Sequence, residues 1–453
     1  MEHSAAVFAM PNPSLLPALA ESFLAGDPAV DQIVLRATRM LGRPWLWLRP
    51  LAQRYVDAFS GLPRPRRREV VQFLCQDAGF RRASAKYFHE LSVEQWLTEP
   101  HRMQPVAAAR GWEVPVIEST GALADWLRLT PGELQWFADL KGLGRRTNCP
   151  PLSHYHYRVL AKRYGNIRLI EMPKPRLKGL QRRILTQILD KIPPHPAAQG
   201  FVKGRSILTF VTPHVGKRVV LRMDLRDFFP SFAGRRVQAL FRTMGYPEAV
   251  ADLLGGICTN EAPGAAWKEL GFDVFVDPQH LREARILYSR PHLPQGTPTS
   301  PAIANLCSYR VDCRIAGLAT AVGVEYTRYA DDLAFSGAGE FERSVERFST
   351  HVAAILHEEG LSVHHRKTRI MRQGVRQYLA GLVANQHVNV VRADFDRLKA
   401  TLHNCRRLGP ESQNREGHPH FRSHLEGRVG FVEMVNPEKG KRLRAIFEQI
   451  EWA

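Results

Sequence analysis

The amino-acid sequence predicts an α+β protein, with helical regions at both ends and an antiparallel, strand-rich centre. Three observations predict this class. Apolar residues recur at helical spacing through much of residues 1–150. The short runs 219–223, 324–328 and 333–336 are rich in β-branched, aromatic and apolar residues, a pattern typical of strands. Basic amphipathic helices follow from about residue 386.

Composition narrows the classes of function that remain. The chain has 453 residues, 44% of them hydrophobic, which predicts a packed core and more than one structural unit. A formal net charge of +19 indicates a polyanionic partner or an anionic membrane surface. The sequence contains no run of eighteen apolar residues and no signal-peptide pattern, so we expect no membrane span and a cytoplasmic location. Its six cysteines form no Cys-x-x-Cys pair, which favours reduced thiols over zinc ligands.

Two features of the N-terminal region can be interpreted locally. The Pro/Arg-rich connector 61–68 either touches phosphates or is a solvated linker, and the sequence does not decide between these. Residues 120–129 and 134–140 have the periodicity of two helices. Between them, Thr130-Pro131-Gly132-Glu133 supplies an N-cap, a first-turn proline and the glutamate of a capping box. We interpret the pair as an ordinary helical hairpin, with a helix-turn-helix as the alternative.

The stretch Tyr329-Ala330-Asp331-Asp332 lies between two of the predicted strands, so a hairpin would carry two adjacent carboxylates at its tip. The alternative is a solvated turn. The flanking residues are apolar, however, and two anions held beside a core repel each other unless a cation lies between them. Divalent metals take carboxylate oxygens, and nucleotidyl transfer uses two such ions. This hypothesis requires a third carboxylate at the end of another strand, and Asp224 follows the strand 219–223.

These residues carry a family resemblance. Asp224 begins the run Asp-Leu-Arg-Asp-Phe-Phe-Pro-Ser, which together with the Tyr-Ala-Asp-Asp stretch resembles reverse transcriptases. Gln295-Gly-Thr-Pro-Thr-Ser-Pro, between the two, is similar to a third signature of that family. The resemblance implies a right-hand polymerase with fingers, a palm that holds an antiparallel sheet, and a helical thumb. We therefore expect a helical N-terminal extension at 1–150, fingers and palm at 151–385, and the thumb at 386–453.

The resemblance also implies roles for individual residues. Asp224, Asp331 and Asp332 would be catalytic and would bind two Mg²⁺ ions, with the backbone carbonyl of Leu225 as a further metal ligand. A second group would contact the incoming deoxynucleotide: Arg168, Lys174, Phe229, Gln295, Gly296 and Lys367.

Each nucleotide contact has a stated role and, for some, an alternative. Arg168 and Lys174 would meet phosphates in a fingers hairpin, and Lys367 would lie near the leaving pyrophosphate. Solvated basic segments are the alternatives for all three. Phe229 would pack beneath the sugar and exclude a 2′-hydroxyl, and the alternative is that Phe228 and Phe229 are both core residues.

Other residues are assigned to the template and primer, or to neither. Gly204 and Arg205 belong to a Gly-Phe-x-x-Gly-Arg-Ser element that would hold the template backbone. Gly381 lies in a strand that matches the primer-grip region. His292 is interpreted as an incidental loop histidine.

Within the class, the sequence most resembles retron enzymes. The family copies part of a structured RNA into single-stranded DNA, which gives a branched RNA–DNA (msDNA), and is associated with antiphage defence. The implied partners are that RNA template, the RNA–DNA hybrid product, dNTPs and a candidate effector protein, with no membrane. Two departures concern RNA recognition: only His214 remains of an Asn-Ala-x-x-His motif, and Leu379-Ala380-Gly381 replaces Val-Thr-Gly. The alternatives are a group II intron-like or other defence-type reverse transcriptase, and a non-catalytic RNA-binding scaffold.

Overall fold

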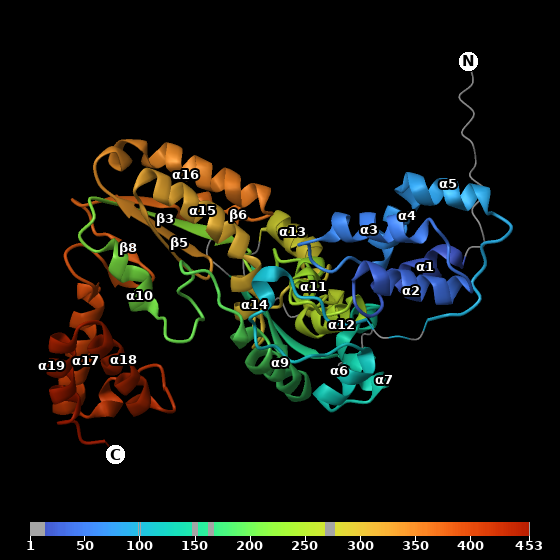
Figure 1. Cartoon of the computed structure of the whole chain (residues 1–453). Helices are drawn as coiled ribbons and strands as arrows, with labels where there is room; N and C mark the ends of the chain where they lie inside the picture. Colours follow the sequence, from blue (N-terminus) through green and yellow to red (C-terminus); the bar gives the residue numbers. More distant parts are fainter. Residues whose placement is uncertain are drawn as a thin grey trace. The chain divides into compact units, whose positions relative to one another are not determined.

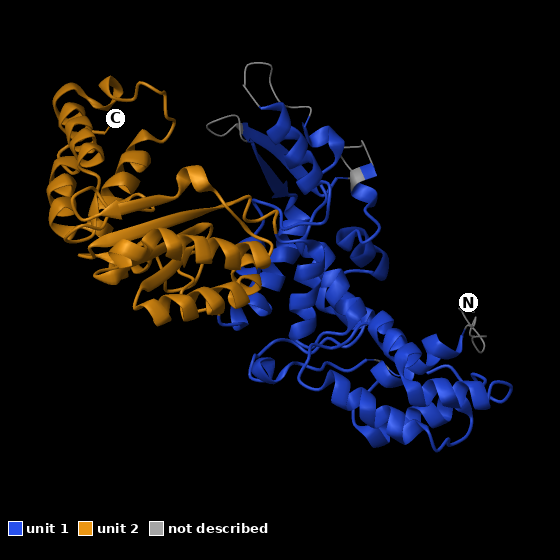
Figure 2. Cartoon of the chain, turned by 90° about the horizontal axis from the view of Figure 1, so that it is seen from above, with its two compact units in different colours: residues 1–193, 232–303 blue, residues 194–231, 304–453 orange. Residues whose placement is uncertain are grey.

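A computed structural model describes residues 14–97, 99, 101–146, 153–161, 167–267 and 277–452. The chain divides into two compact units, each built from two separate segments of sequence (Figure 2). Unit 1 comprises residues 1–193 and 232–303, and unit 2 comprises 194–231 and 304–453. Helices and antiparallel sheets occur together in the chain, which confirms the α+β class. The predicted division into an N-terminal extension, fingers and palm, and thumb stays a prediction.

Unit 1 begins with a helical bundle, as the sequence predicts. Its buried face gathers the apolar positions that recur at helical spacing, among them Leu19, Phe23 and Ile33. Aromatic rings extend this core, and the rings of Phe23 and Tyr55 meet edge to face at 5.0 Å. The helices are α1 (Leu15–Leu24), α2 (Val30–Leu41), α3 (Leu48–Phe59), α4 (Arg67–Gln76) and α5 (Ala78–Lys86).

The rest of unit 1 contains a two-stranded hairpin, β1 (Tyr155–Ala161) and β2 (Ile167–Pro173). Thr130 and Glu133 form the predicted capping box, in which the Glu133 carboxylate accepts from the Thr130 backbone N–H at 2.9 Å. The helices of this part are α6 (Thr120–Leu127), α7 (Pro131–Ala138), α8 (Leu143–Arg146), α9 (Pro175–Gln187), α11 (Gly234–Thr243), α12 (Glu248–Cys258) and α13 (Pro278–Tyr288). α6 and α7 contact each other and α12, as expected for a helical hairpin that packs on the rest of its unit.

Unit 2 is organised around an antiparallel sheet with β3 at its centre. β5 pairs with one edge of β3, and β7 and β6 pair with the other edge at successive positions. The first residues of β3 are buried on both faces, as expected for a central strand. The strands are β3 (Val219–Arg226), β4 (Glu325–Tyr329), β5 (Asp332–Gly337), β6 (Ser362–Val363) and β7 (Arg369–Arg372).

Two long helices, α15 (Tyr309–Val322) and α16 (Glu340–Glu358), lie against this sheet (Figure 1). Phe335 of β5 stacks on Tyr326 at 5.0 Å and meets Phe348 of α16 edge to face at 5.1 Å. Aromatic packing thus joins the sheet to α16 on this face. α14 (Ser300–Cys307) precedes α15 in the chain.

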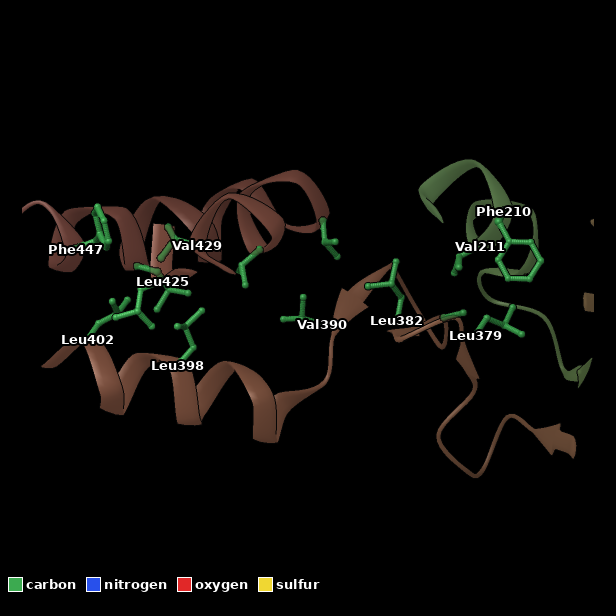
Figure 3. Packing of buried hydrophobic residues seen from close by; sticks show 14 of the residues in the cluster. Phe210, Val211, Leu379, Leu382, Val390, Leu398, Leu402, Leu425, Val429 and Phe447 are labelled. Carbon is green, nitrogen blue, oxygen red and sulfur yellow. The ribbon is translucent and has the colours of Figure 1, made fainter. Parts of the chain in front are cut away.

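The C-terminal part of unit 2 shares a second core with the sheet. Figure 3 shows Leu398 and Leu402 facing Leu425 and Val429 from neighbouring helices, while Leu382 extends the cluster toward Phe210. The elements are α10 (Ile207–Val211), β8 (Tyr378–Leu379), β9 (Leu382–Val383), β10 (Asn389–Val390), α17 (Arg392–Leu408), α18 (Phe421–Val435) and α19 (Pro437–Phe447).

Short 3₁₀ turns occur in both units, at Ala107–Ala109, Leu189–Lys191, Thr212–His214, Gly264–Trp267, His365–Lys367 and Pro410–Ser412. Across the described ranges, no helix combines the length and the apolar character that a membrane span requires.

Candidate active site

The three aspartates singled out in the sequence meet at one end of the β3–β5 ladder. Asp224 pairs directly with Asp332, the first residue of β5. The sequence placed Asp224 after its strand, whereas β3 continues to Arg226, so Asp224 lies inside the ladder and its backbone is fixed by hydrogen bonds on both sides. Directly opposed residues in such a ladder have side chains on the same face, so the two carboxylates are neighbours.

The turn between β4 and β5 brings in the third aspartate. Ala330 has φ of +53°, a left-handed conformation that an alanine adopts only at some energetic cost. The Leu225 backbone N–H donates to the Asp331 carbonyl at 2.8 Å, which ties the turn to β3. The Ala330 carbonyl accepts from the buried guanidinium of Arg328 at 3.2 Å. The predicted set of Asp224, Leu225, Asp331 and Asp332 is thus brought together by backbone contacts.

Arg328 is itself held by a buried ion pair that sequence reasoning missed. Its Nε and Nη2 donate to the two carboxylate oxygens of Asp312 at 2.8 and 2.7 Å, and both side chains are almost completely buried. Asn305 links this pair to the loop that contains Gly200. Its side-chain oxygen accepts from Arg328 at 3.1 Å, and its amide nitrogen donates to the Gly200 carbonyl at 2.8 Å. The aspartate hairpin therefore rests on a rigid polar network.

Two basic side chains lie against the aspartates. The Nζ of Lys367 donates to both oxygens of Asp224, at 2.9 and 3.2 Å. Arg222, two residues before Asp224 on β3, donates to Asp332 through Nε at 2.8 Å. Burial raises the pKa of Asp332, Arg222 works against that increase, and the neighbouring Asp331 and Asp224 add to it.

The donor chemistry of this site fits a hard divalent cation, although the carboxylates are not already gathered around a single point. Within the described ranges, no group of three or more His, Cys, Asp or Glu side chains is arranged to hold a metal ion. Asp224 contacts Lys367, and Asp332 contacts Arg222. Three aspartates carry more negative charge than these two cations neutralise, and oxygen ligands are what Mg²⁺ requires.

The two phenylalanines after Asp224 have different environments. Phe228 is buried, with the Arg328 guanidinium 5.8 Å from the centre of its ring. Phe229 is half-buried and contacts Phe228 edge to face at 5.5 Å. Phe228 is thus the core residue of the pair, and Phe229 keeps an accessible ring surface.

The loop that contains Gly204 and Arg205, predicted to hold the template, is stabilised by contacts with its own backbone. Gly204 has φ of +78°, which favours glycine at this turn. Arg205 directs Nη1 to the carbonyls of His195 and Pro196 at 3.1 and 3.0 Å. This nitrogen therefore stabilises the loop, and its contact with template stays a prediction. Gly381 has φ of +92° in the β8–β9 turn.

The remaining nucleotide-binding candidates belong to unit 1. Arg168 is half-buried on β2, and its Nε has no hydrogen-bond partner among the residues that the structure describes. Lys174 directly precedes α9, and its backbone N–H donates to the His154 carbonyl at 2.9 Å. The Gln295 carbonyl accepts from the Glu171 N–H at 2.8 Å. Gln295, with its neighbour Gly296, therefore lies against β2, the strand that carries Arg168. The aspartates and Lys367 belong to unit 2.

The interpretation of His292 as an incidental loop histidine is wrong. Its side chain is 1% exposed and lies 2.9 Å from the carboxylate of Glu171, which is fully buried. Neither residue belongs to a recognisable local motif. Because 121 positions separate them, no periodicity in the sequence could have indicated the pair.

The known proteins that this chain is similar to are reverse transcriptases, in agreement with the arrangement of the aspartates. A family profile described as reverse transcriptase (RNA-dependent DNA polymerase) matches residues 160–381. The retron Mx65 reverse transcriptase of Myxococcus xanthus is 42% identical over 64% of this chain and 63% of its own length. The retron Mx162 reverse transcriptase of the same organism is 36% identical over 78% of this chain and 70% of its own length. The retron Ec86 reverse transcriptase of Escherichia coli is 32% identical over 63% of this chain and 77% of its own length.

The matched region contains the three aspartates and the hairpin that holds them. This chain spans 63% of the length of the Mx65 enzyme and more than two thirds of the Mx162 and Ec86 enzymes. With that extent of similarity and this arrangement of carboxylates, the chain belongs to the bacterial retron reverse transcriptases, a family of RNA-directed DNA polymerases.

Proposed function

We propose that this protein copies part of a dedicated structured RNA into single-stranded DNA, leaves a branched RNA–DNA product (msDNA), and acts in antiphage defence. The single observation that carries the proposal is the pairing of Asp224 with Asp332 beside the Asp331 turn, in a chain of retron type. The proposed substrates are dNTPs and the RNA template, with the RNA–DNA hybrid as product and an effector protein as a further partner. The fingers, palm and thumb roles of the segments belong to the same proposal.

In this function the aspartates and the backbone carbonyl of Leu225 would hold two divalent ions, proposed as Mg²⁺. Such ions activate the attacking hydroxyl and stabilise the charge of the leaving phosphate. Lys367 contacts Asp224, and its proposed place is near the leaving pyrophosphate, where it would act as a general acid. Arg168 and Lys174 would neutralise triphosphate oxygens, while Gln295 and Gly296 would lie along the nucleotide.

The decisive test compares nucleic acid that copurifies with the protein from its native host, before and after RNase treatment. The variant carries Asp331→Asn and Asp332→Asn together, which removes the negative charge and keeps the side-chain size. We expect DNA synthesis to be abolished while RNA binding stays nearly unchanged. The matched control is Asp57→Asn, the same chemical change at an exposed position on α3.

Each outcome supports or rejects the proposal. One DNA of fixed length, joined to RNA through an RNase-resistant branch and absent from the double variant, supports it. Heterogeneous or untemplated DNA would favour another defence-type polymerase. If RNA is bound and no DNA is made, the non-catalytic scaffold is the better description. Synthesis that persists in the double variant contradicts the catalytic role of the aspartates.

A second prediction concerns sugar selection by Phe229. Because its ring is half-buried beside the core residue Phe228, truncation should open space without collapsing the core. We expect Phe229→Ala to raise incorporation of ribonucleotides relative to deoxynucleotides, measured by primer extension with matched dNTP and rNTP pairs. Phe228→Ala is the comparison, because it should lower stability without a selective effect on rNTP use. Unchanged discrimination in Phe229→Ala would assign the steric role to another residue.

A further inference from the structure

Strand β2 carries functional groups on both of its faces. Burial alternates along the strand, so Arg168 lies on the more accessible face and Glu171 lies on the buried one. The Glu171 side chain has no exposed surface. A carboxylate is rarely buried to this degree unless its partners are charged or donate hydrogen bonds.

The partners of Glu171 determine the charge of the pair. One carboxylate oxygen accepts from the Asn260 amide at 2.7 Å, and the other lies 2.9 Å from Nε2 of His292. The second ring nitrogen of His292, Nδ1, lies 2.7 Å from the Arg290 carbonyl oxygen. The Arg290 carbonyl oxygen can only accept, so Nδ1 carries hydrogen, and Nε2 carries one as well when the Glu171 carboxylate is ionised. This geometry fits a buried imidazolium–carboxylate pair.

Electrostatics agrees with this assignment. Burial by itself lowers the pKa of His292, but the charge and hydrogen bond of Glu171 outweigh it, and the net pKa is raised. Glu261 adds a smaller effect in the same direction. Other titratable groups lie around the pair: Tyr155, whose pKa is raised by burial and then by the charge of Glu171; Tyr288, whose ring is 4.9 Å from that of His292; and Tyr157, whose hydroxyl accepts from Asn260. Burial raises the pKa of Tyr157 to about 12, so this hydroxyl is neutral.

The pair joins β2 to the segment that contains the Gln295–Gly296 turn. His292 is three residues before Gln295, whose carbonyl accepts from the Glu171 N–H at 2.8 Å. A Cβ on Gly296 would lie 2.9 Å from the Glu171 carbonyl oxygen, and Gly296 has φ of +127°. The segment is therefore attached to Glu171 by side chain at one point and by backbone at a second.

We propose that Glu171 and His292 are positioning residues for the incoming dNTP, which hold the Gln295–Gly296 turn against the strand that carries Arg168. The inference rests on the proposed function, because it assigns the turn and Arg168 to nucleotide binding. Loss of a proton from His292 leaves a ring nitrogen without hydrogen facing an oxygen, so the attachment weakens. The stabilisation that the His292–Glu171 pair gives to this turn is complete at low pH, and it is lost as pH rises through the raised pKa of His292. dNTP binding should therefore weaken on the alkaline side.

The test uses Glu171→Gln and His292→Asn, which remove the charges but keep polar side chains. The dissociation constant of a dNTP would be measured on full-length protein with primer–template and Ca²⁺, in parallel with KM and kcat with Mg²⁺. We expect each variant to raise both Kd and KM about tenfold near neutral pH, with kcat changed less than about threefold. His280→Asn is the matched control, a partly exposed histidine of the same unit that pairs with Asp277.

A second measurement needs no variant to fold well. Histidine labelled with ¹³C at Cε1 gives the pKa of His292 in the wild-type protein, and dNTP affinity is measured across the same pH range. Weakening of affinity that follows the titration of His292, and that is absent or moved to lower pH in Glu171→Gln, supports the inference. Affinity that is constant through this titration overturns it, as does an unchanged Kd in both variants.

The two proposals fail in different ways. If the wild-type protein binds dNTP with this pH dependence but extends no primer, the polymerase function fails and the positioning role survives. If it extends primers normally while both variants retain the wild-type Kd and KM, the positioning role fails alone. Absence of dNTP binding at every pH rejects both.

Discussion

Each unit of this protein buries a histidine, and the two are held in opposite states of charge. His292 in unit 1 is 1% exposed and His214 in unit 2 is fully buried. His292 lies between a carboxylate and a carbonyl oxygen, whereas His214 lies between the hydroxyls of Ser336 and Thr327, at 2.7 and 2.8 Å. Burial, with a small contribution from Lys217, lowers the pKa of His214 to about 3. Equal burial thus gives a cation in one unit and a neutral ring in the other.

The two histidines differ in charge because the hydroxyls around His214 can donate hydrogen bonds, whereas the carboxylate and carbonyl oxygens around His292 only accept them. The Thr327 hydroxyl donates to the Phe210 carbonyl at 2.9 Å, so it accepts from Nε2–H of His214. Nδ1 of His214 then carries no hydrogen and accepts from the Ser336 hydroxyl. A hydroxyl can supply the missing hydrogen, which a carboxylate cannot. The neutral ring joins β4 to β5 behind the aspartate hairpin, and the charged ring joins β2 to the Gln295–Gly296 turn.

The largest expected effect comes from removing the anion of unit 1. Glu171→Ala would leave the His292 cation buried without its partner, which costs roughly 3–5 kcal/mol in such sites. We expect the urea midpoint of unfolding to fall strongly at pH 6, measured by circular dichroism. Glu171→Gln is the control, because its amide oxygen still accepts a hydrogen bond, and it should lose less. Equal stability of Glu171→Ala and wild type would show that His292 is not charged.

Acid should act on His214 with the next largest effect. Its folded pKa lies below the ordinary value of about 6.5, so its contribution to stability is complete above that value and is lost as pH falls toward 3. The expected loss is about 1.4 kcal/mol for each pH unit below 6.5. Chemical unfolding between about pH 6.5 and 4.5 measures it, and His214→Asn isolates the contribution by lacking it. Identical pH dependence in the variant and wild type would rule out a neutral buried His214.

The smallest effect is expected from the hydroxyls themselves. Ser336→Ala removes the donor to Nδ1 of His214 and should lower the free energy of unfolding by about 1 kcal/mol, the typical cost of one buried hydrogen bond. Thr327→Val should cost slightly more, because Thr327 also donates to the Phe210 carbonyl. Thermal unfolding measures both changes. A larger loss for Ser336→Ala than for Thr327→Val would reverse the proton assignment on His214.

Features that depend on neighbouring residues could be predicted from the sequence. The alternation around 324–336 predicts the hairpin, and the capping box at Thr130 predicts where α7 begins. The aspartate set also follows, because the ordered motifs give both the residue types and the strands that hold them. Even here the sequence ended the strand before Asp224, whereas β3 runs on to Arg226.

Contacts between distant segments could not be predicted in the same way. Glu171 and His292 are 121 residues apart, and Asp312 lies 16 residues before Arg328, so no local pattern indicates either pair. The Nη1 contacts of Arg205 with carbonyls of its own loop were not predicted either, and its contact with template stays a prediction. Periodicity reports which face of an element is buried, but it does not report which charged group will meet it there.

Because Asp224 pairs directly with Asp332, the register of the β3–β5 ladder determines whether the two carboxylates are neighbours. Side chains alternate from face to face along a strand, so a shift of one residue between β3 and β5 would send the two carboxylates to opposite faces of the sheet. A single-residue insertion within β3 or β5, before the paired aspartates, would therefore alter this alignment, whereas many surface loops tolerate such a change in length. In these two strands, inserting one residue should be more damaging than most substitutions.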